Sequence, residues 1–125
     1  MLMICGGRKR FTNFNELQTP PLLIEQFVEP CILLCILQEP RHGYAIMQYL
    51  KETCLCEAID AGNFYRVLSK LKNENLIAAQ KDGRKFIYHI TAHGKVFLSG
   101  WKTTLEKNKA VLAAYLQKYE EVAHV

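Results

Sequence analysis

The residues with the clearest chemistry lie in one segment, about residues 62–74, whose pattern predicts a half-buried helix. Its apolar positions recur every three or four residues: Phe64, Val67, Leu68 and Leu71. The other face carries polar and cationic side chains: Asn63, Arg66, Ser69, Lys70 and Asn73, with Tyr65 and Lys72 beside them. Short amides and hydroxyls reach base edges and cations bind phosphates, so this face fits a nucleic acid. An ordinary amphipathic surface helix has the same pattern, so the helix alone leaves both interpretations open.

A predicted β-hairpin with a basic tip follows this helix. Residues 76–81 and 85–91 are strand-like, and in the second segment Phe86, Tyr88 and Ile90 alternate on one face. The dipeptide Asp82-Gly83 is a strong signal for a two-residue turn between them. The tip carries three cations: Lys81, Arg84 and Lys85. We expect them to point into solvent or toward a phosphate backbone.

The distribution of charge singles out the same segment of the chain. The total is mild, since 16 Lys and Arg against 12 Asp and Glu leave a net charge of +4. Residues 11–61 nevertheless carry seven acidic and two basic residues, whereas residues 62–109 carry ten basic and three acidic. Concentrated Lys and Arg displace counterions from phosphates, so the predicted helix and hairpin lie in the region best suited to a polyanion.

Two further helices are predicted before the basic region. Pro30 fits the first turn of a helix, and residues 31–37 have no polar face, so this helix should be central and buried. Pro40 ends it, and the spacing of Tyr44, Met47 and Leu50 predicts a second helix over residues 43–51. The segment before Pro30 shows no sustained period and is expected to be an arm, with a short helix or an extended lead-in over residues 22–28.

A long last helix is predicted from about residue 92 to residue 121, roughly 45 Å at 1.5 Å per residue. Asp60 and Thr91 are the expected N-caps of the third and last helices. A domain this small cannot cover so long a helix. Steps of three and four residues mark a coiled-coil-type seam: Leu105, Asn108, Leu112, Tyr115, Tyr119 and Val122, extended by Phe97 and Trp101. We expect a homodimer through this seam, with Asn108 paired with its own copy; the alternative is a seam folded back on its own domain.

Three helices, a hairpin and a further helix follow the order of a winged helix-turn-helix. We therefore expect a mainly α fold with a small β-hairpin wing and a long C-terminal dimerisation helix. We expect the chain to divide into an N-terminal arm at residues 1–29, a winged helix-turn-helix DNA-binding domain at 30–91 and the dimerisation helix at 92–125. In this arrangement the third helix enters the major groove of double-stranded DNA and the wing touches the flanking backbone or the minor groove.

Three motifs make the sequence resemble the PadR family of bacterial transcriptional regulators. They are Glu-Pro-Arg-His-Gly-Tyr-Ala-Ile at 39–46, Gly-Asn-Phe-Tyr-Arg-Val-Leu-Ser-Lys-Leu at 62–71, and Gly-Arg-Lys-Phe-Ile-Tyr-His-Ile-Thr at 83–91, followed by Gly94. The resemblance covers the chain from about Pro30 to the C-terminus. It implies a homodimer and repression that is usually released by a small-molecule effector. By position, Tyr44 and Tyr65 match the family's motif tyrosines, and Arg84 and Lys85 lie in its wing.

The chain departs from the family pattern at two positions of the third helix. Asn63 stands where Thr or Ser is common, which bears on base preference, since Asn can pair bidentately with adenine. Asn75 stands where Gly commonly ends the helix, and Asn tolerates the left-handed conformation needed there. His42, in the first motif, is expected to position its turn or to meet phosphate.

The cysteines and one tryptophan suggest an alternative function. Cys54 and Cys56 flank Leu55 in the turn before the third helix and are candidates for metal or redox sensing, without a finger-like set of ligands nearby. Cys31 and Cys35 read as small buried hydrophobes. Some members of the family that this sequence resembles hold flat apolar ligands on an aromatic residue near the position of Trp101. Trp101 and Phe97 are therefore candidate effector-binding residues, although the sequence favours a core or dimer-seam role for Trp101. The alternative is a metal-, redox- or cofactor-sensing dimer whose winged helix makes protein contacts.

The sequence supports neither an enzyme nor a membrane protein. No Ser-His-Asp order, paired-acid motif or glycine-rich phosphate loop appears, so we expect no enzyme and no resident cofactor. The longest apolar runs, such as residues 31–37, fall far short of the ~18 residues that span a bilayer. At 125 residues we expect one domain, located in the cytoplasm, without a membrane partner.

Overall fold

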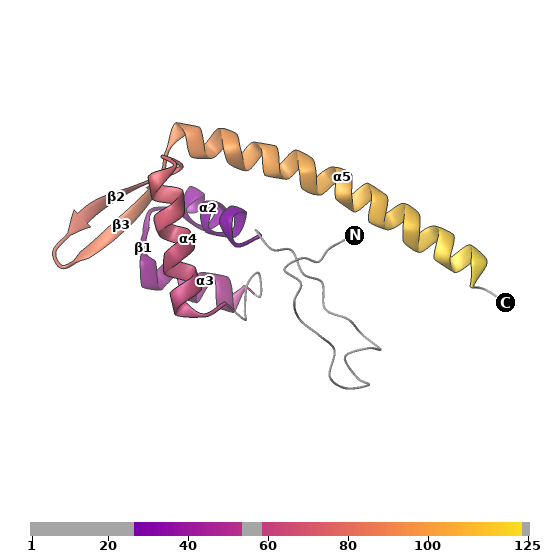
Figure 1. The fold of residues 1–125 in the computed structure, drawn as a ribbon, viewed down its shortest axis with the longest axis horizontal. Helices are drawn as coiled ribbons and strands as arrows, with labels where there is room; N and C mark the ends of the chain where they lie inside the picture. Colours follow the sequence, from indigo (N-terminus) through magenta and orange to yellow (C-terminus); the bar gives the residue numbers. More distant parts are fainter. Residues whose placement is uncertain (1–26, 54–58, 124–125) are drawn as a thin grey trace.

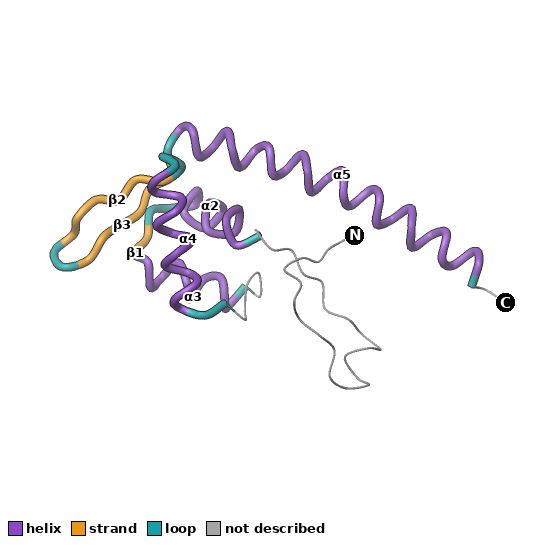
Figure 2. Tube along the Cα trace, viewed as in Figure 1, coloured by secondary structure: helices purple, strands orange, loops and turns teal. Residues whose placement is uncertain are grey.

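A computed structural model describes residues 27–53 and 59–123 of the chain. The element order is α2 (Val28–Gln38), β1 (Arg41–His42), α3 (Gly43–Glu52), α4 (Ala61–Asn73), β2 (Ile77–Asp82), β3 (Lys85–Ile90) and α5 (Ala92–Val122). Three short helices form a cluster beside a small sheet, and α5 crosses the cluster before running away from it (Figures 1 and 2). The expected mainly α fold with a hairpin wing and a long last helix is therefore confirmed.

Helix α2 begins at Val28, two residues before Pro30, so the last two residues of the expected arm, 28 and 29, belong to the helix. Val28 and Glu29 are helical, and Pro30 lies in the first turn. The N–H groups of a first turn have no partner within the helix, so a proline fits there as well as at the very first position. Residues 1–26 of the expected arm, and with them most of the predicted lead-in over residues 22–28, lie outside the described residues.

The core forms where α2, α3 and α4 meet. Helix α2 is buried along most of its length, as expected for a helix without a polar face. Helices α3 and α4 turn one apolar stripe each toward it and leave their polar faces outside. The largest fully buried side chains are Phe64, Ile32, Leu33, Ile36, Ile46, Leu50, Leu68, Leu71 and Ile77. Packing of the three helices therefore removes most of α2 and the apolar stripes of α3 and α4 from water.

The sheet has three antiparallel strands in the order β1-β3-β2. Strands β2 and β3 pair from Ile77 with Ile90 to Asp82 with Lys85 and form the wing. The turn lies one residue later than expected, at Gly83 and Arg84, because Asp82 still pairs across the ladder. Gly83 has φ 66°, a left-handed conformation that a residue with a side chain adopts only at a cost. The two-residue strand β1 was not predicted, and it joins the turn between α2 and α3 to the wing.

The ends of α4 are closed by local hydrogen bonds. Asp60 caps the start, where its carboxylate accepts a hydrogen bond of 2.8 Å from the backbone N–H of Asn63. At the other end the N–H of Asn75 donates to the carbonyl of Lys72, and the N–H of Leu76 donates to that of Leu71. Asn75 adopts φ 62°. These bonds form a Schellman motif, so asparagine does here what glycine more often does.

Helix α5 is fixed to the domain only over its first part. The Thr91 hydroxyl caps it by accepting a 2.9 Å hydrogen bond from the N–H of Gly94, as expected. Leu98, Trp101 and Leu105 are half-buried, and from Glu106 to Ala123 every residue is exposed. The exposed part carries large apolar side chains: Val111, Leu112, Tyr115, Leu116, Tyr119 and Val122. Within the described ranges no helix has the length and apolar character needed to span a membrane.

Candidate nucleic-acid interface

The face of α4 opposite the core is short, polar and exposed. At 100° per residue, Gly62, Arg66, Ser69 and Asn73 point most directly away from the buried stripe. The guanidinium of Arg66 donates a 2.5 Å hydrogen bond to the side-chain carbonyl of Asn63, one turn earlier. The remaining N–H groups of the Arg66 guanidinium and the Asn63 amide are then held in a fixed direction, which suits contact with base edges or phosphates.

Lys70 and Tyr65 lie on opposite flanks of this face. Tyr65 faces the wing, since it lines one pocket with Lys85 and Phe86. Its ring also packs edge-on against its buried neighbour Phe64, with 5.0 Å between centroids. Lys70 faces the start of α2, and its ammonium lies 2.6 Å from the carboxylate of Glu29 and 3.5 Å from that of Glu74. Of the five α4 residues expected to bind DNA, Lys70 is therefore the one whose charge is already engaged within the domain.

A shallow pocket of about 250 Å³ lies where β1, the start of α3, α4 and the wing meet. Four of the expected DNA-binding residues line it, together with one glycine and two aromatic residues: His42, Gly43, Tyr44, Tyr65, Lys85, Phe86 and Tyr88. Tyr44 and Tyr65 are 64% and 43% exposed, so their hydroxyls remain open to a ligand. A lysine ammonium and tyrosine hydroxyls around one hollow are donors that a phosphate oxygen accepts.

Local geometry explains how this pocket keeps its shape. His42 Nε2 lies 2.9 Å from the carboxylate of Asp82, which ties β1 to the end of the wing. A Cβ added at Gly43 would lie 3.1 Å from the Tyr65 ring, so the glycine lets that ring approach the backbone. The pKa of Tyr88 is raised, first by burial and then by the neighbouring Tyr65, and its hydroxyl is therefore neutral at physiological pH.

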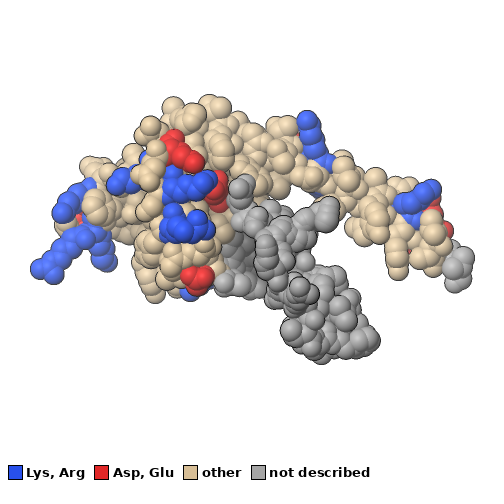
Figure 3. All heavy atoms as spheres, viewed as in Figure 1, with Lys and Arg blue, Asp and Glu red and all other residues tan. Residues whose placement is uncertain are grey.

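The wing continues the basic surface from α4. Lys81, Arg84 and Lys85 are exposed, and the blue side chains of Figure 3 gather over the wing and over α4. The Lys72 ammonium lies 6.0 Å from the ring centre of Phe86 and so connects the two elements. Phe86 lines the pocket but was not among the expected site residues, although its place in the alternating strand pattern could have indicated it.

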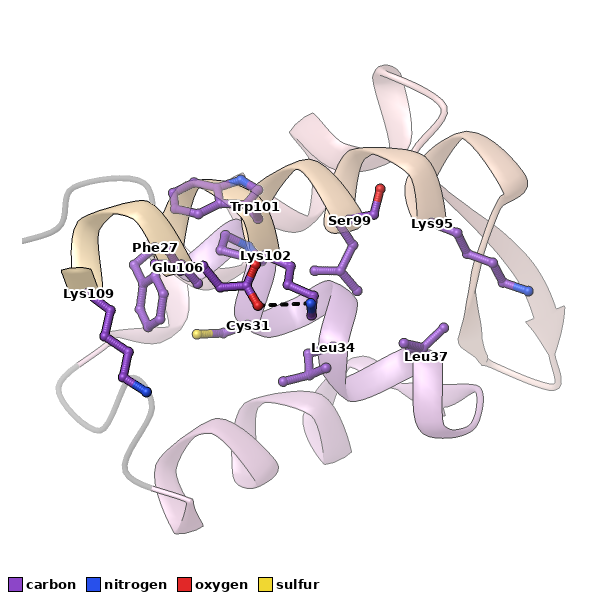
Figure 4. A pocket seen from close by; sticks show the side chains of 13 residues that line it. Phe27, Cys31, Leu34, Leu37, Lys95, Ser99, Trp101, Lys102, Glu106 and Lys109 are labelled. Carbon is purple, nitrogen blue, oxygen red and sulfur yellow. Dashed lines mark hydrogen bonds and ion pairs between the residues drawn. The ribbon is translucent and has the colours of Figure 1, made fainter. Parts of the chain in front are cut away.

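A second, larger pocket lies between α2 and α5. Its volume is about 550 Å³ and its walls are almost wholly apolar, among them Phe27, Cys31, Leu34, Leu98, Trp101 and Leu105. Figure 4 shows the pocket from close by, with side chains from α2 and α5 around it. Phe27 meets Trp101 edge-on with 6.2 Å between ring centres. We call this pocket the apolar groove.

The two expected effector-binding residues are not brought together. Trp101 forms part of the wall of the apolar groove, whereas Phe97 does not line it and stays 36% exposed. Leu98, the next residue, occupies the inward position instead, because α2 lies on that side of α5. Three lysines and one glutamate stand among the lining residues: Lys95, Lys102, Lys109 and Glu106. Lys102 and Glu106 are joined at 2.9 Å.

The cysteines divide between the core and the part of the chain that is not described. Cys54 and Cys56, the candidates for metal or redox sensing, lie outside the described residues. Cys35 is buried in α2, and burial raises the pKa of its thiol, which lowers its reactivity at neutral pH. Within residues 27–53 and 59–123, no group of three or more His, Cys, Asp or Glu side chains could hold a metal ion.

Comparisons with known proteins place this arrangement in a family. The model of the transcriptional regulator PadR-like family matches residues 32–100, more than half of the chain. No curated protein matches the sequence. Among solved structures, a PadR-like transcriptional regulator from Bacillus cereus is 27% identical, with a TM-score of 0.65 over 72% of this chain and 91% of its own.

Two further structures share the fold. A PadR-like transcription factor from Bacteroides fragilis is 26% identical, with a TM-score of 0.61 over 70% of this chain and 88% of its own. A PadR family transcription regulator from Clostridium difficile is 23% identical, with a TM-score of 0.66 over 72% of this chain and 98% of its own. Members of the family are regulators and not enzymes, as expected for this chain. The chain belongs to the PadR-like family of transcriptional regulators, which bind DNA.

Proposed function

We propose that the protein is a homodimeric, sequence-specific DNA-binding repressor that a small molecule releases from its operator. Helix α4 would enter the major groove and the wing would lie on the backbone. One observation carries the proposal: the open donors of the α4 face, the tyrosine-lined pocket and the wing cations form one continuous basic surface. A reading helix flanked by backbone contacts is what sequence recognition requires.

The shallow pocket would hold a backbone phosphate. Tyr44 and Tyr65 would donate their hydroxyls and Lys85 its ammonium, while His42 keeps its bond to Asp82 and anchors the wing. A phosphate fixed at this point sets the register of α4 along the groove, since backbone contacts position a protein and base contacts specify the sequence. Arg66 and Asn63 would then make the base contacts, with Ser69 one turn further along.

The exposed part of α5 supports the homodimer. A helix with a row of large apolar side chains in water needs a partner, and the apolar groove beside the first part of α5 needs an occupant. Antiparallel pairing of two α5 helices centred on Asn108 would place the partner's Tyr115 opposite Trp101, so that aromatic seam residues of the two chains cover each other.

The effector would bind where the two subunits meet at the apolar groove. Its walls are apolar and aromatic, with Trp101 and Phe27 edge-on, and these suit a flat apolar molecule. Such a molecule would compete with the close packing of α2 on α5. Phe97, outside the groove in a single chain, could contact an effector only from the outer side of α5.

A binding titration tests the DNA-binding proposal. Anisotropy of a labelled duplex from upstream of the protein's own gene should rise with protein concentration and show a strong dependence on salt. Arg66→Ala and Arg84→Ala should each weaken binding at least about tenfold, since each removes a charged contact. Lys118→Ala, which removes an exposed cation far along α5, is the matched control and should bind as the wild type does. Equal affinity for unrelated DNA would contradict sequence specificity.

A further inference from the structure

One ion pair ties the predicted reading helix to the start of α2. Within the described residues, Glu29 is the one charged residue that is buried, at 7% exposed. Its carboxylate accepts a 2.6 Å hydrogen bond from the ammonium of Lys70. Glu29 lies in the first turn of α2 and Lys70 in the last turns of α4, 41 residues apart in sequence. The pair therefore fixes one helix against the other at a defined point.

The burial of Glu29 prevents Lys70 from turning to DNA. A buried carboxylate is costly unless it is paired, so an ammonium that left for a phosphate would strand it. Glu74 adds a second carboxylate 3.5 Å from the same ammonium. The hydrogen bond to Glu29 is also the main reason that the pKa of Lys70 is raised, so the lysine stays charged throughout the physiological range.

The position of the pair on α4 points the same way. Lys70 lies on the flank that faces α2, while Tyr65 on the opposite flank faces the wing. Two residues before Glu29, Phe27 packs on Trp101 of α5 at the edge of the apolar groove. The first turn of α2 thus contacts both the reading helix and the last helix, and the Glu29 carboxylate is its polar contact with α4.

We propose that Glu29 and Lys70 form a positioning clamp, which sets the angle at which the α4 face meets the operator, and that Lys70 binds no phosphate. The clamp rests on the proposed DNA-binding function, and it gives a positioning role to Lys70, which the sequence pattern places among the DNA contacts. Both residues are positioning residues, because they act through the placement of Arg66 and Asn63.

The first part of the test measures stability, without DNA. Lys70→Met leaves the Glu29 carboxylate buried and unpaired and should lower the melting temperature by about 10 °C. Glu29→Leu should cost much less, because the freed ammonium is partly exposed and still lies near Glu74. The double variant Glu29→Leu/Lys70→Met removes both charges and should regain most of the loss. Additive effects of the two substitutions would overturn the clamp.

The second part measures operator binding by anisotropy at several salt concentrations, well below every melting temperature. The stable double variant should bind the operator about tenfold more weakly, with unchanged binding to unrelated DNA and an unchanged salt slope. The matched control is Lys85→Met, which removes a lysine at a proposed phosphate contact. It should reduce the slope of log affinity against log salt concentration by about 0.9 per subunit. Lys70→Arg keeps the ion pair and should retain wild-type affinity.

Each result decides a different point. A double variant with a reduced salt slope like that of Lys85→Met would show that Lys70 binds phosphate, and a double variant with wild-type affinity would show that the pair only stabilises the fold. Either result overturns the positioning role. Wild-type protein that binds no DNA in a sequence-specific way would contradict the proposed function itself, while the stability cycle would still decide whether the ion pair forms.

Discussion

At the scale of single residues, Gly94 shows how tightly the last helix is set on the domain. A Cβ added there would lie 2.1 Å from the carbonyl oxygen of Leu76 and 2.8 Å from the side chain of Ile90. Both contacts are far inside van der Waals separation, and the first involves backbone that cannot rotate away. The glycine therefore lets the first turn of α5 lie directly against the connection that begins the wing.

Gly94→Ala is expected to lower the free energy of unfolding by about 2–3 kcal/mol, since the added methyl forces backbone apart. Urea denaturation followed by circular dichroism measures the change. Gly100→Ala, six residues later in the same helix, is the matched control: its Cβ meets nothing within 4 Å, and the better helix former should raise stability by about 0.5–1 kcal/mol. A Gly94 variant as stable as the Gly100 variant would contradict the close approach.

Residue-scale features were predictable where they depend on near neighbours in sequence. The caps Asp60 and Thr91 act on N–H groups three residues away, and both predictions are confirmed. The ion pair between Lys70 and Glu29 was not predictable, because the two residues lie 41 positions apart and only the packing of α2 on α4 brings them together. The same reason explains why Leu98, and not Phe97, faces the groove.

At the scale of elements, the helices and the hairpin were predictable because each carries its own periodicity and end signals. The strand β1 has two residues and no pattern of its own; it forms because Arg41 and His42 are brought beside Tyr88 and Ile87. The turn of the wing lies one residue later than the sequence predicts, because the pairing of the two strands extends to Asp82 and Lys85. Elements that exist only through a tertiary neighbour left no signal in the sequence.

The end of α4 provides a prediction at this scale. Asn75 holds φ 62° so that the chain can turn from the reading helix into β2. Asn75→Gly should leave stability unchanged or raise it slightly, whereas Asn75→Ala should lower the free energy of unfolding by about 1 kcal/mol, because an alanine Cβ disfavours that conformation. Thermal melts of the two variants measure the difference. Equal melting temperatures would mean that the backbone there is not left-handed.

At the scale of the whole molecule, a single chain leaves much apolar surface open to water. More than half of α5, from Glu106 onward, is exposed along its whole surface and carries large apolar side chains. The apolar groove beside the first part of α5 is open to water as well. The expectation of a dimer followed from the seam spacing in sequence, but the groove that could receive the partner helix did not, since it depends on the position of α2 beside α5. The two surfaces together support two chains as the working unit.

The double substitution Leu112→Asp/Tyr115→Asp should convert the proposed dimer to a monomer, because the seam would bury unpaired carboxylates. The dissociation constant of the dimer should rise at least about 100-fold. Both side chains are exposed in the single chain, so each domain should remain folded. Ala113→Asp with Gln117→Asp adds the same charge to the opposite face of α5 and is the matched control. Sedimentation velocity measures the state of each protein. A dimer that persists in the first variant would place the interface elsewhere.

In the proposed dimer, two chains read one DNA site through paired α4 helices. Selection of bound duplexes from a pool with a randomised segment of about 30 base pairs, using the purified full chain, tests it most directly. We predict that the recovered sequences converge on an inverted repeat whose half-site centres lie about 34 Å apart, one turn of the double helix. Recovery of sequences no more related than the starting pool, or of a single half-site without symmetry, would contradict the account.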